Sequence, residues 1–257
     1  MLMKDWNKEV GYLENTRKRM WNDDYFEFLV KHVWKIDHPV NILDVGCGYG
    51  DLGKRLLPII PGGSSYKGID IAEDLIEKAR EDFKVTKYDT DFEVKNLLEY
   101  EPIEIYDIVI CQSVLRHIPE VKEVLKKMIA SVVSGGLVIC IEPSRKMENA
   151  GLYIDDKDFD IFENDEFLKE RWQQEYSNGG RDFLVGMKIP GYMAEMGLRN
   201  VSVRVNDYVD FISKSGTENY KESKDAFMQN CGIDNKYNDA TSYLSARCHL
   251  ISFGVKS

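Results

Sequence analysis

Short apolar runs alternate with amphipathic segments between residues 40 and 141. Runs of this length, bounded by turn residues, are typical of buried strands, whereas apolar residues at helical spacing indicate helices that cover a sheet. An alternation of the two predicts βαβ units and a parallel sheet with helices on both faces, which binds ligands at the carboxyl ends of its strands. The expected strands are 40–45, 66–71, 91–95, 106–111 and 137–141, and the expected helices are 51–57, 73–83 and 121–132.

The segments that flank this region read differently. Residues 11–34 are helical in period, with a second helix start at Asn22, and predict a helical cap over residues 1–38. After residue 143 the sequence becomes polar and aromatic over 144–180, with one helix around 166–175, and we interpret it as an insertion that contributes no strand. Insertions of this length in a compact domain are usually functional, so this one is expected to fold over the ligand edge as a lid.

The C-terminal part completes the predicted sheet. A further helix is expected over 190–196, and the last two strands over 201–205 and 246–255, with a second polar lid insertion over 207–241 between them. The sequence therefore predicts one α/β domain over residues 1–257. Its core is a Rossmann-like, seven-stranded, mostly parallel sheet with helices on both faces.

The first strand runs into a glycine-rich turn, LDVGCGYG at residues 43–50. Its glycines let the backbone turn sharply and approach a ligand without interference from a Cβ atom. From Gly48 to Gly53 the letters match G-x-G-x-x-G, the dinucleotide fingerprint. Asp44 ends the strand and Asp51 opens the helix, however, and both acids would repel a pyrophosphate at the helix start. A cationic cofactor without phosphate suits this turn better.

A further acid stands at the carboxyl end of the second strand, in YKGIDIAE. There the carboxylate of Asp70 can accept hydrogen bonds from both hydroxyls of a ribose. Taken alone, Asp70 could merely cap the helix that follows it. The glycine turn and the acid together indicate a nucleoside cofactor.

With these motifs the chain resembles the class I S-adenosylmethionine-dependent methyltransferases, in the small-molecule branch that includes the ubiquinone and menaquinone biosynthesis enzymes. The resemblance covers about residues 40–141, through LDVGCGYG, YKGIDIAE, FEVKNLLEY, YDIVICQSVLRHIPE and SGGLVICIEP. It implies S-adenosylmethionine as the cofactor. The contacts that it implies are Asp44, Gly46, Gly48 and Gln112 at the methionine moiety, Asp70 at the ribose, Ile71 on the adenine face, and Asn96 with Leu97 at the adenine edge.

Before the sheet, Tyr12, Arg17 and Arg19 form the pattern Y-x4-R-x-R. It is similar to the segment at this place in glycine N-methyltransferase-type enzymes, where an arginine pairs with the cofactor carboxylate. A solvated basic helix face explains the two arginines equally well. Trp21 and Tyr25 are expected to belong to the core.

Two residues are candidates for acting on a methyl acceptor. Methyl transfer from a sulfonium is an in-line displacement that alignment and water exclusion accelerate, and a base is needed only if the acceptor is protonated. His117, in the loop after the fourth strand, is the candidate base, with a hydrogen bond to the following helix start as the alternative. Glu142, at the end of the fifth strand, is expected to face the same cleft and hold an acceptor amine or hydroxyl, although ordinary solvation explains it equally well.

Amino-acid composition limits the classes of molecule that the protein can bind. The 44 acidic against 34 basic residues give a net charge of −10, which argues against nucleic acid and against anionic membranes as partners. The fourth motif also lacks the Asn/Asp-Pro-Pro-aromatic cluster with which other class I enzymes hold a planar amino group. No His or Cys spacing suggests a metal site, and no apolar run reaches the roughly 18 residues of a membrane span. We therefore expect a cytoplasmic protein without a metal.

The sequence thus predicts S-adenosylmethionine-dependent methyl transfer to a small-molecule acceptor. Two alternatives remain open. One is an NAD(P)-dependent oxidoreductase, which the literal G-x-G-x-x-G would serve. The other is a non-catalytic module that binds S-adenosylmethionine.

Overall fold

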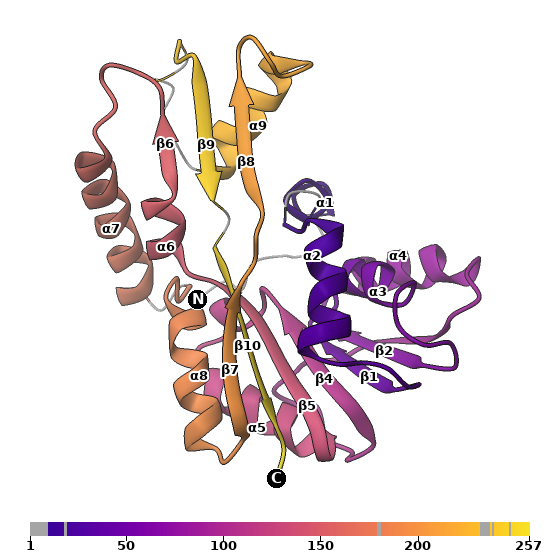
Figure 1. The fold of residues 1–257 in the computed structure, drawn as a ribbon. Helices are drawn as coiled ribbons and strands as arrows, with labels where there is room; N and C mark the ends of the chain where they lie inside the picture. Colours follow the sequence, from indigo (N-terminus) through magenta and orange to yellow (C-terminus); the bar gives the residue numbers. More distant parts are fainter. Residues whose placement is uncertain (1–9, 18–19, 179–180, 232–236, 238, 247) are drawn as a thin grey trace.

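A seven-stranded sheet forms the centre of the molecule in the computed structural model, which describes residues 10–17, 20–178, 181–231, 237, 239–246 and 248–257 (Figure 1). The strand order is β3-β2-β1-β4-β5-β10-β7, and β10 runs antiparallel to both of its neighbours. The mostly parallel Rossmann-like sheet is therefore confirmed. Its strands are β1 (Asn41–Val45), β2 (Ser65–Asp70), β3 (Asp89–Val94), β4 (Tyr106–Gln112), β5 (Val132–Pro143), β7 (Arg199–Val205) and β10 (His249–Val255).

Alternate residues of the central strands enter two separate cores. In β4, Ile108 and Ile110 pack on one side of the sheet, whereas Val109 and Cys111 pack on the other. Side chains of a strand point to opposite faces in turn, so a strand that is apolar at every position must be covered on both faces. The continuous apolar runs of the sequence follow from this arrangement.

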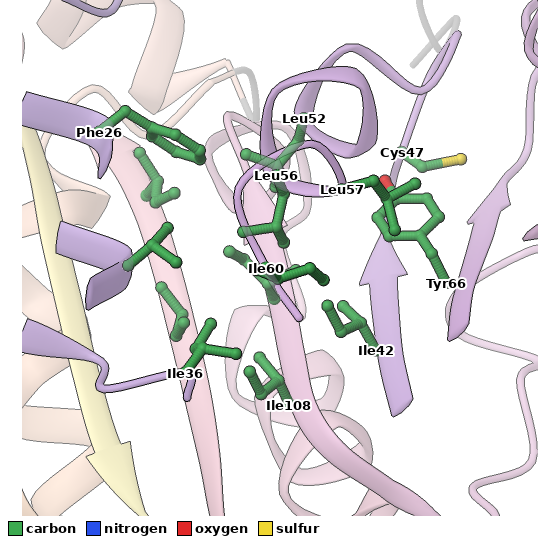
Figure 2. Close-up of a cluster of buried hydrophobic side chains, with 14 of the residues drawn as sticks. Phe26, Ile36, Ile42, Cys47, Leu52, Leu56, Leu57, Ile60, Tyr66 and Ile108 are labelled. Atoms are coloured by element: carbon green, nitrogen blue, oxygen red, sulfur yellow. The ribbon is translucent and has the colours of Figure 1, made fainter. Parts of the chain in front are cut away.

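Helices cover both faces, as predicted. The first core contains side chains of α2 (Asp23–Phe28), α3 (Asp51–Leu56) and α4 (Glu73–Lys84), and Figure 2 shows Leu52 and Leu56 of α3 in it. The second core contains side chains of α5 (Val121–Ser131) and α8 (Val185–Glu195). The sheet is thus held between two helical layers, and its strand ends are left to form a site.

The N-terminal segment contains the two predicted helices, α1 (Val10–Arg17) and α2, and α2 continues into a π-helical turn, η2 (Leu29–Val33). Trp21 between the helices is buried, as expected, and its Nε1 donates to Oε1 of Gln112 at 3.0 Å. Tyr25 is only half-buried, and its hydroxyl donates to the Val205 carbonyl at 2.9 Å. The segment is therefore fixed to the ends of β4 and β7.

The two insertions are joined by a second sheet, which the sequence did not predict. This small sheet consists of β6 (Leu152–Ile154), β8 (Val209–Ser213) and β9 (Ser242–Ala246) in the antiparallel order β6-β9-β8, and α9 (Tyr220–Cys231) packs beside β8. The expectation that 144–180 contributes no strand is wrong. With three residues, β6 is too short to show an alternating pattern, and only pairing with β9 defines it.

The small sheet has a core of its own. Leu152 and Ile154 pack there with Ile212, Phe227 and Tyr243. Figure 1 shows β8 as the continuation of β7, and β9 leading into β10. The strand predicted over 246–255 is β10, which begins at His249, and Ala246 of the predicted range is the last residue of β9.

Several boundaries also differ from the prediction. The strand predicted over 137–141 is longer, because β5 begins at Val132, directly after α5. Gly135 and Gly136 lie in this extension, where they exchange backbone hydrogen bonds of 3.0 Å with Lys256. The helix predicted over 190–196 begins earlier, at Val185, because its apolar face packs on the sheet, and this packing outweighs the donor lost at Pro190. The remaining elements are η3 (Leu115–His117), α6 (Arg145–Ala150) and α7 (Ile161–Ser177).

Candidate functional site

A cavity of about 370 Å³ opens at the carboxyl ends of β1, β2 and β4, where the sheet topology places a ligand. Nearly all of the residues predicted to bind a cofactor line it. Its walls come from the glycine turn, the ends of the three strands, α1 and the start of α4. The predicted residues that line the cavity are Arg17, Asp44, Gly46, Gly48, Asp70, Ile71, Asn96, Leu97, Gln112 and His117.

Two glycines of the turn are required for different reasons. Both have a positive φ, +76° at Gly46 and +55° at Gly48, which side chains rarely adopt. A Cβ atom at Gly46 would lie 2.4 Å from Cγ2 of Val114, so packing demands glycine there. Among the described residues, a Cβ atom at Gly48 would meet only Cδ1 of Leu75, at 3.9 Å. Gly48 therefore leaves room that belongs to the cavity.

Asp70 organises this turn from the end of β2. Its Oδ2 accepts from the Gly48 N–H at 2.8 Å, and its Oδ1 accepts from the Ala72 N–H at 2.9 Å. Burial raises the pKa of Asp70, and these N–H donors oppose the rise. Because each carboxylate oxygen can accept a second hydrogen bond, Asp70 can support the turn and still bind the hydroxyls of a ribose.

Asp44 is a buried acid in the floor of the cavity. Its Oδ2 accepts from the Tyr66 hydroxyl, and its Oδ1 has no hydrogen-bond partner among the described residues. Burial raises the pKa of Asp44 from 3.8 to about 7, although the hydrogen bond from Tyr66 lowers it. An acceptor oxygen left over in a buried acid is what a cationic ligand would satisfy.

The cavity as a whole fits a cationic nucleoside. Acidic side chains around it include Asp44, Asp51, Asp70 and Glu120, against the guanidinium of Arg17. Its apolar wall includes Ile71, whose side chain is 45% exposed in the absence of a ligand and offers a flat surface to a base. A sulfonium and an ammonium suit the acidic walls, whereas a pyrophosphate does not.

Of the predicted N-terminal contacts, the structure describes the side chain of Arg17 alone. Arg17 lines the cavity, where its Nη1 donates to Ser113 Oγ at 3.2 Å and its Nη2 to the Gln112 carbonyl at 3.5 Å. Arg19 lies outside the described residues, as does the side chain of Tyr12. The pairing of Arg17 with a cofactor carboxylate stays a prediction.

The adenine edge is also untested. Asn96 and Leu97 both line the cavity. The side chain of Asn96 bonds locally, because its Oδ1 accepts from the Leu98 N–H at 3.0 Å and its Nδ2 donates to Glu99 at 3.1 Å. A contact of Asn96 with the base would have to use its remaining lone pair and amide hydrogen.

Comparison with known proteins agrees with this geometry. Residues 43–138 match a family described as a methyltransferase domain. Over 111 residues the chain is 32% identical to the ubiquinone biosynthesis O-methyltransferase of Shewanella sp. (strain ANA-3), an alignment that covers 42% of this chain and 45% of that protein. Residues 43–138 thus carry the methyltransferase domain of this family.

Two further comparisons define the extent of the likeness. The chain is 36% identical over 110 residues to an uncharacterized protein of Methanocaldococcus jannaschii, covering 42% of this chain and 30% of that one. It thus spans less than half the length of both relatives. Phosphoethanolamine N-methyltransferase 2 of Haemonchus contortus, solved with S-adenosyl-L-methionine, has a TM-score of 0.61 at 13% identity, covering 100% of this chain and 60% of that one. This neighbour shows a shared fold.

The two predicted catalytic residues differ in their placement. His117 lines the cavity, but its Nε2 accepts from Nε of Arg116 at 2.9 Å. That nitrogen can act as a base only after this bond breaks, and the role of His117 stays a prediction.

No helix within the described residues has both the length and the apolar character of a membrane span.

The expectation that Glu142 faces the cleft is wrong. Glu142 is fully buried and does not line the cavity. Its Oε1 accepts from the N–H groups of Val114 and Leu115, at 2.7 and 2.8 Å. Burial raises the pKa of Glu142, and the two donors oppose the rise. The carboxylate thus holds the loop after β4, whose backbone donors would otherwise be unsatisfied.

Sequence reasoning missed several residues that the structure brings to this site. Ser113 lines the cavity with a left-handed backbone, at a φ of +59°, and Tyr66 holds Asp44 from β2. His249 approaches Ser113 from β10. A serine in this conformation is strained, and no sequence pattern predicts it. Contacts between distant strands likewise leave no local signal.

Replacement of Asp70 tests the nucleoside site. Asp70→Ala removes the ribose acceptor and frees the Gly48 N–H, so we expect affinity for S-adenosylhomocysteine to fall by about 1.5–3 kcal/mol. Isothermal titration measures the change. Glu73→Ala, which removes an exposed acid three residues along the chain, is the control and should bind normally. Equal affinity of both variants would refute the assignment of Asp70.

Proposed function

We propose that this methyltransferase transfers a methyl group from S-adenosylmethionine to a small-molecule acceptor. The acidic cavity beneath the glycine turn carries the proposal, because it leaves a buried oxygen of Asp44 without a partner and offers a cationic nucleoside both charge and an apolar wall. The net charge of −10 supports a small acceptor over nucleic acid. The O-methyltransferase among the relatives supports a hydroxyl acceptor.

Each residue would contact one part of the cofactor, according to its place in the cavity. Asp70 would bind the ribose, Ile71 would pack against the base, and Asp44 would face the positive charge of the methionine end. When bound, the cofactor supplies an electrophilic methyl group. The chain aligns an acceptor with it and excludes water, and these two effects provide most of the acceleration in such displacements.

Labelled cofactor identifies the product. Cell extract incubated with the purified chain and S-adenosylmethionine carrying an isotopically labelled methyl group should yield S-adenosylhomocysteine and a labelled compound heavier by one CH₂. Mass spectrometry detects both, and Asp70→Ala provides the matched protein control. Binding of S-adenosylhomocysteine without transfer to any extract component would instead support the non-catalytic module.

Titration with NADPH separates the oxidoreductase alternative. Asp44 and Asp51 lie at the turn where a pyrophosphate would bind, so we expect no saturable binding. S-adenosylhomocysteine in the same calorimeter serves as the positive control. Saturable NADPH binding together with no response to S-adenosylhomocysteine would overturn the proposed function.

A further inference from the structure

A path of polar side chains leads from the cofactor cavity into the interior below the small sheet. Ser113, at the end of β4, lines the cavity, and its Oγ lies 3.4 Å from Nε2 of His249, the first residue of β10. Across the imidazole ring, Nδ1 of His249 lies 3.9 Å from Oε1 of Glu148 in α6. All three side chains are buried. A serine, a histidine and a carboxylate are therefore arranged in series, with the serine at the cavity.

Neighbouring groups give this series a direction. Arg17 Nη1 donates to Ser113 Oγ at 3.2 Å, and a guanidinium can only donate. With one lone pair of Ser113 Oγ taken by Arg17, the hydroxyl proton can point to Nε2 of His249 when that nitrogen is unprotonated. In this tautomer the ring proton is on Nδ1, on the side of the Glu148 carboxylate.

The backbone holds both ends of the series. Ser113 has a φ of +59°, a costly conformation for serine, and its N–H donates to the Ile141 carbonyl at 2.8 Å. The N–H of His249 donates to Oδ1 of Asn206 at 2.9 Å. Glu148 forms an ion pair with Arg145 of the same helix. This strained backbone conformation places the Ser113 hydroxyl on the cavity wall.

We propose that Ser113 Oγ, backed by His249 and Glu148, deprotonates a hydroxyl acceptor during methyl transfer, an inference that rests on the proposed function. Ser113 takes the acceptor's hydroxyl proton and passes its own proton to Nε2 of His249. The acceptor oxygen keeps the electron pair that bonds the methyl carbon, and the pair of the broken carbon–sulfur bond stays on sulfur. His249 becomes cationic beside Glu148 and later returns the proton to water.

The series selects the class of acceptor. A hydroxyl is a weak nucleophile until its proton leaves, so a base in contact with it accelerates transfer, whereas a neutral amine attacks with its own lone pair. His117 does not compete in this arrangement, because its Nε2 accepts from Arg116. Ser113 is thus the catalytic residue, and His249 and Glu148 position and receive its proton.

The charged and titratable groups around His249 set its protonation. Glu148 and Arg145 come from α6, and Arg17 reaches Ser113 from α1. Glu142 of β5 binds the backbone directly after Ser113, and Cys248 precedes the histidine. A rate that depends on neutral His249 should therefore rise with pH through one ionisation and then reach a plateau.

Nuclear magnetic resonance of the protein labelled with ¹⁵N-histidine tests the series without turnover. We expect His249 to be the Nδ1–H tautomer near neutral pH, with an Nε2 resonance that shifts in Ser113→Ala. His38→Gln, at an exposed histidine, assigns and controls the spectrum. An Nε2–H tautomer of His249, or an Nε2 resonance that Ser113→Ala leaves unchanged, would overturn the proposal.

Turnover tests the chemistry with a panel of phenols, catechols and hydroxy acids beside matched primary amines. We expect O-methylated products, and His249→Gln should lower kcat by about 100-fold or more with the affinity for S-adenosylhomocysteine kept within threefold. The methyl-transfer rate of His249→Gln should also keep rising with pH instead of reaching the plateau of the wild type. We expect the same loss of kcat and of the plateau in Ser113→Ala.

The outcomes separate the two proposals. Wild-type turnover with unchanged kcat and pH profile in both variants would overturn the base series alone, as would products methylated only on nitrogen. Loss of the plateau in His117→Gln instead would assign the base to His117. S-adenosylhomocysteine binding without wild-type turnover on the panel or the extract would overturn the proposed function and the series together.

Discussion

Gly48→Asn is expected to abolish the binding of S-adenosylhomocysteine and leave the protein folded. Asparagine adopts the left-handed conformation that Gly48 has at a φ of +55°, so the fold should lose only about 1–2 kcal/mol. Its side chain would enter the space that only Cδ1 of Leu75 borders, and this space is part of the cavity. We expect affinity to fall by at least about 100-fold, which corresponds to the 2.7 kcal/mol or more of a steric conflict that cannot relax.

Gly197 provides the matched control. It has a φ of +86° and open space around a Cβ atom, and it does not line the cavity. Gly197→Asn therefore carries the same backbone cost and should bind S-adenosylhomocysteine normally. Calorimetric titration and thermal unfolding of both variants give the comparison. Normal binding by Gly48→Asn would mean that the cofactor does not approach this turn.

Asp44→Asn is expected to weaken cofactor binding and to stabilise the free protein at pH 8. The pKa of Asp44 is about 7 in the folded chain because of burial, against an ordinary value of 3.8. The folded state therefore holds this proton more tightly than the unfolded state, and the resulting stability is lost as pH rises through about 7. With about 1.4 kcal/mol for each pKa unit, and one new amide group to satisfy, the gain at pH 8 should be about 1–3 kcal/mol.

Cofactor binding, in contrast, should require the ionised form of Asp44. A cationic methionine end binds ionised Asp44, so wild-type affinity for S-adenosylmethionine should fall as pH drops below about 7, by up to tenfold for each pH unit. Asp44→Asn should bind at least about 100-fold more weakly at pH 8 and show no such pH dependence. Urea unfolding and calorimetry at pH 6 and 8 measure both effects, with exposed Glu77→Gln as the control. If Asp44→Asn were less stable than the wild type at pH 8, the ionised carboxylate of Asp44 would not destabilise the fold, contrary to this prediction.

The large sheet could be predicted because its signals are local. Strands such as β4 contain a continuous apolar run, here from Ile108 to Cys111, and helices such as α5 have apolar residues at helical spacing, so each element carries its own pattern. The cofactor cavity followed for the same reason, since Asp44, Gly48 and Asp70 directly follow or end strands. Topology then brings the ends of adjacent parallel strands together without further information.

What the sequence did not predict depends on partners far along the chain. The strand β6 exists through its pairing with β9, and His249 matters through its distance to Ser113. Glu142 turned away from the cavity because two backbone donors of the loop after β4 required an acceptor. These contacts form only in the folded chain, where each buried polar group needs a hydrogen-bond partner.

The junction between the two sheets limits how independently the protein can change. Glu148 lies just before β6 and His249 just after β9, and these strands pair through Leu152 and Ser245, with the Ala246 N–H donating to the Gly151 carbonyl at 3.0 Å. A graft that replaced the small sheet would therefore also change the spacing of the histidine and the carboxylate beside it. Under the proposed base series, such a graft would preserve proton transfer only if it also kept this spacing.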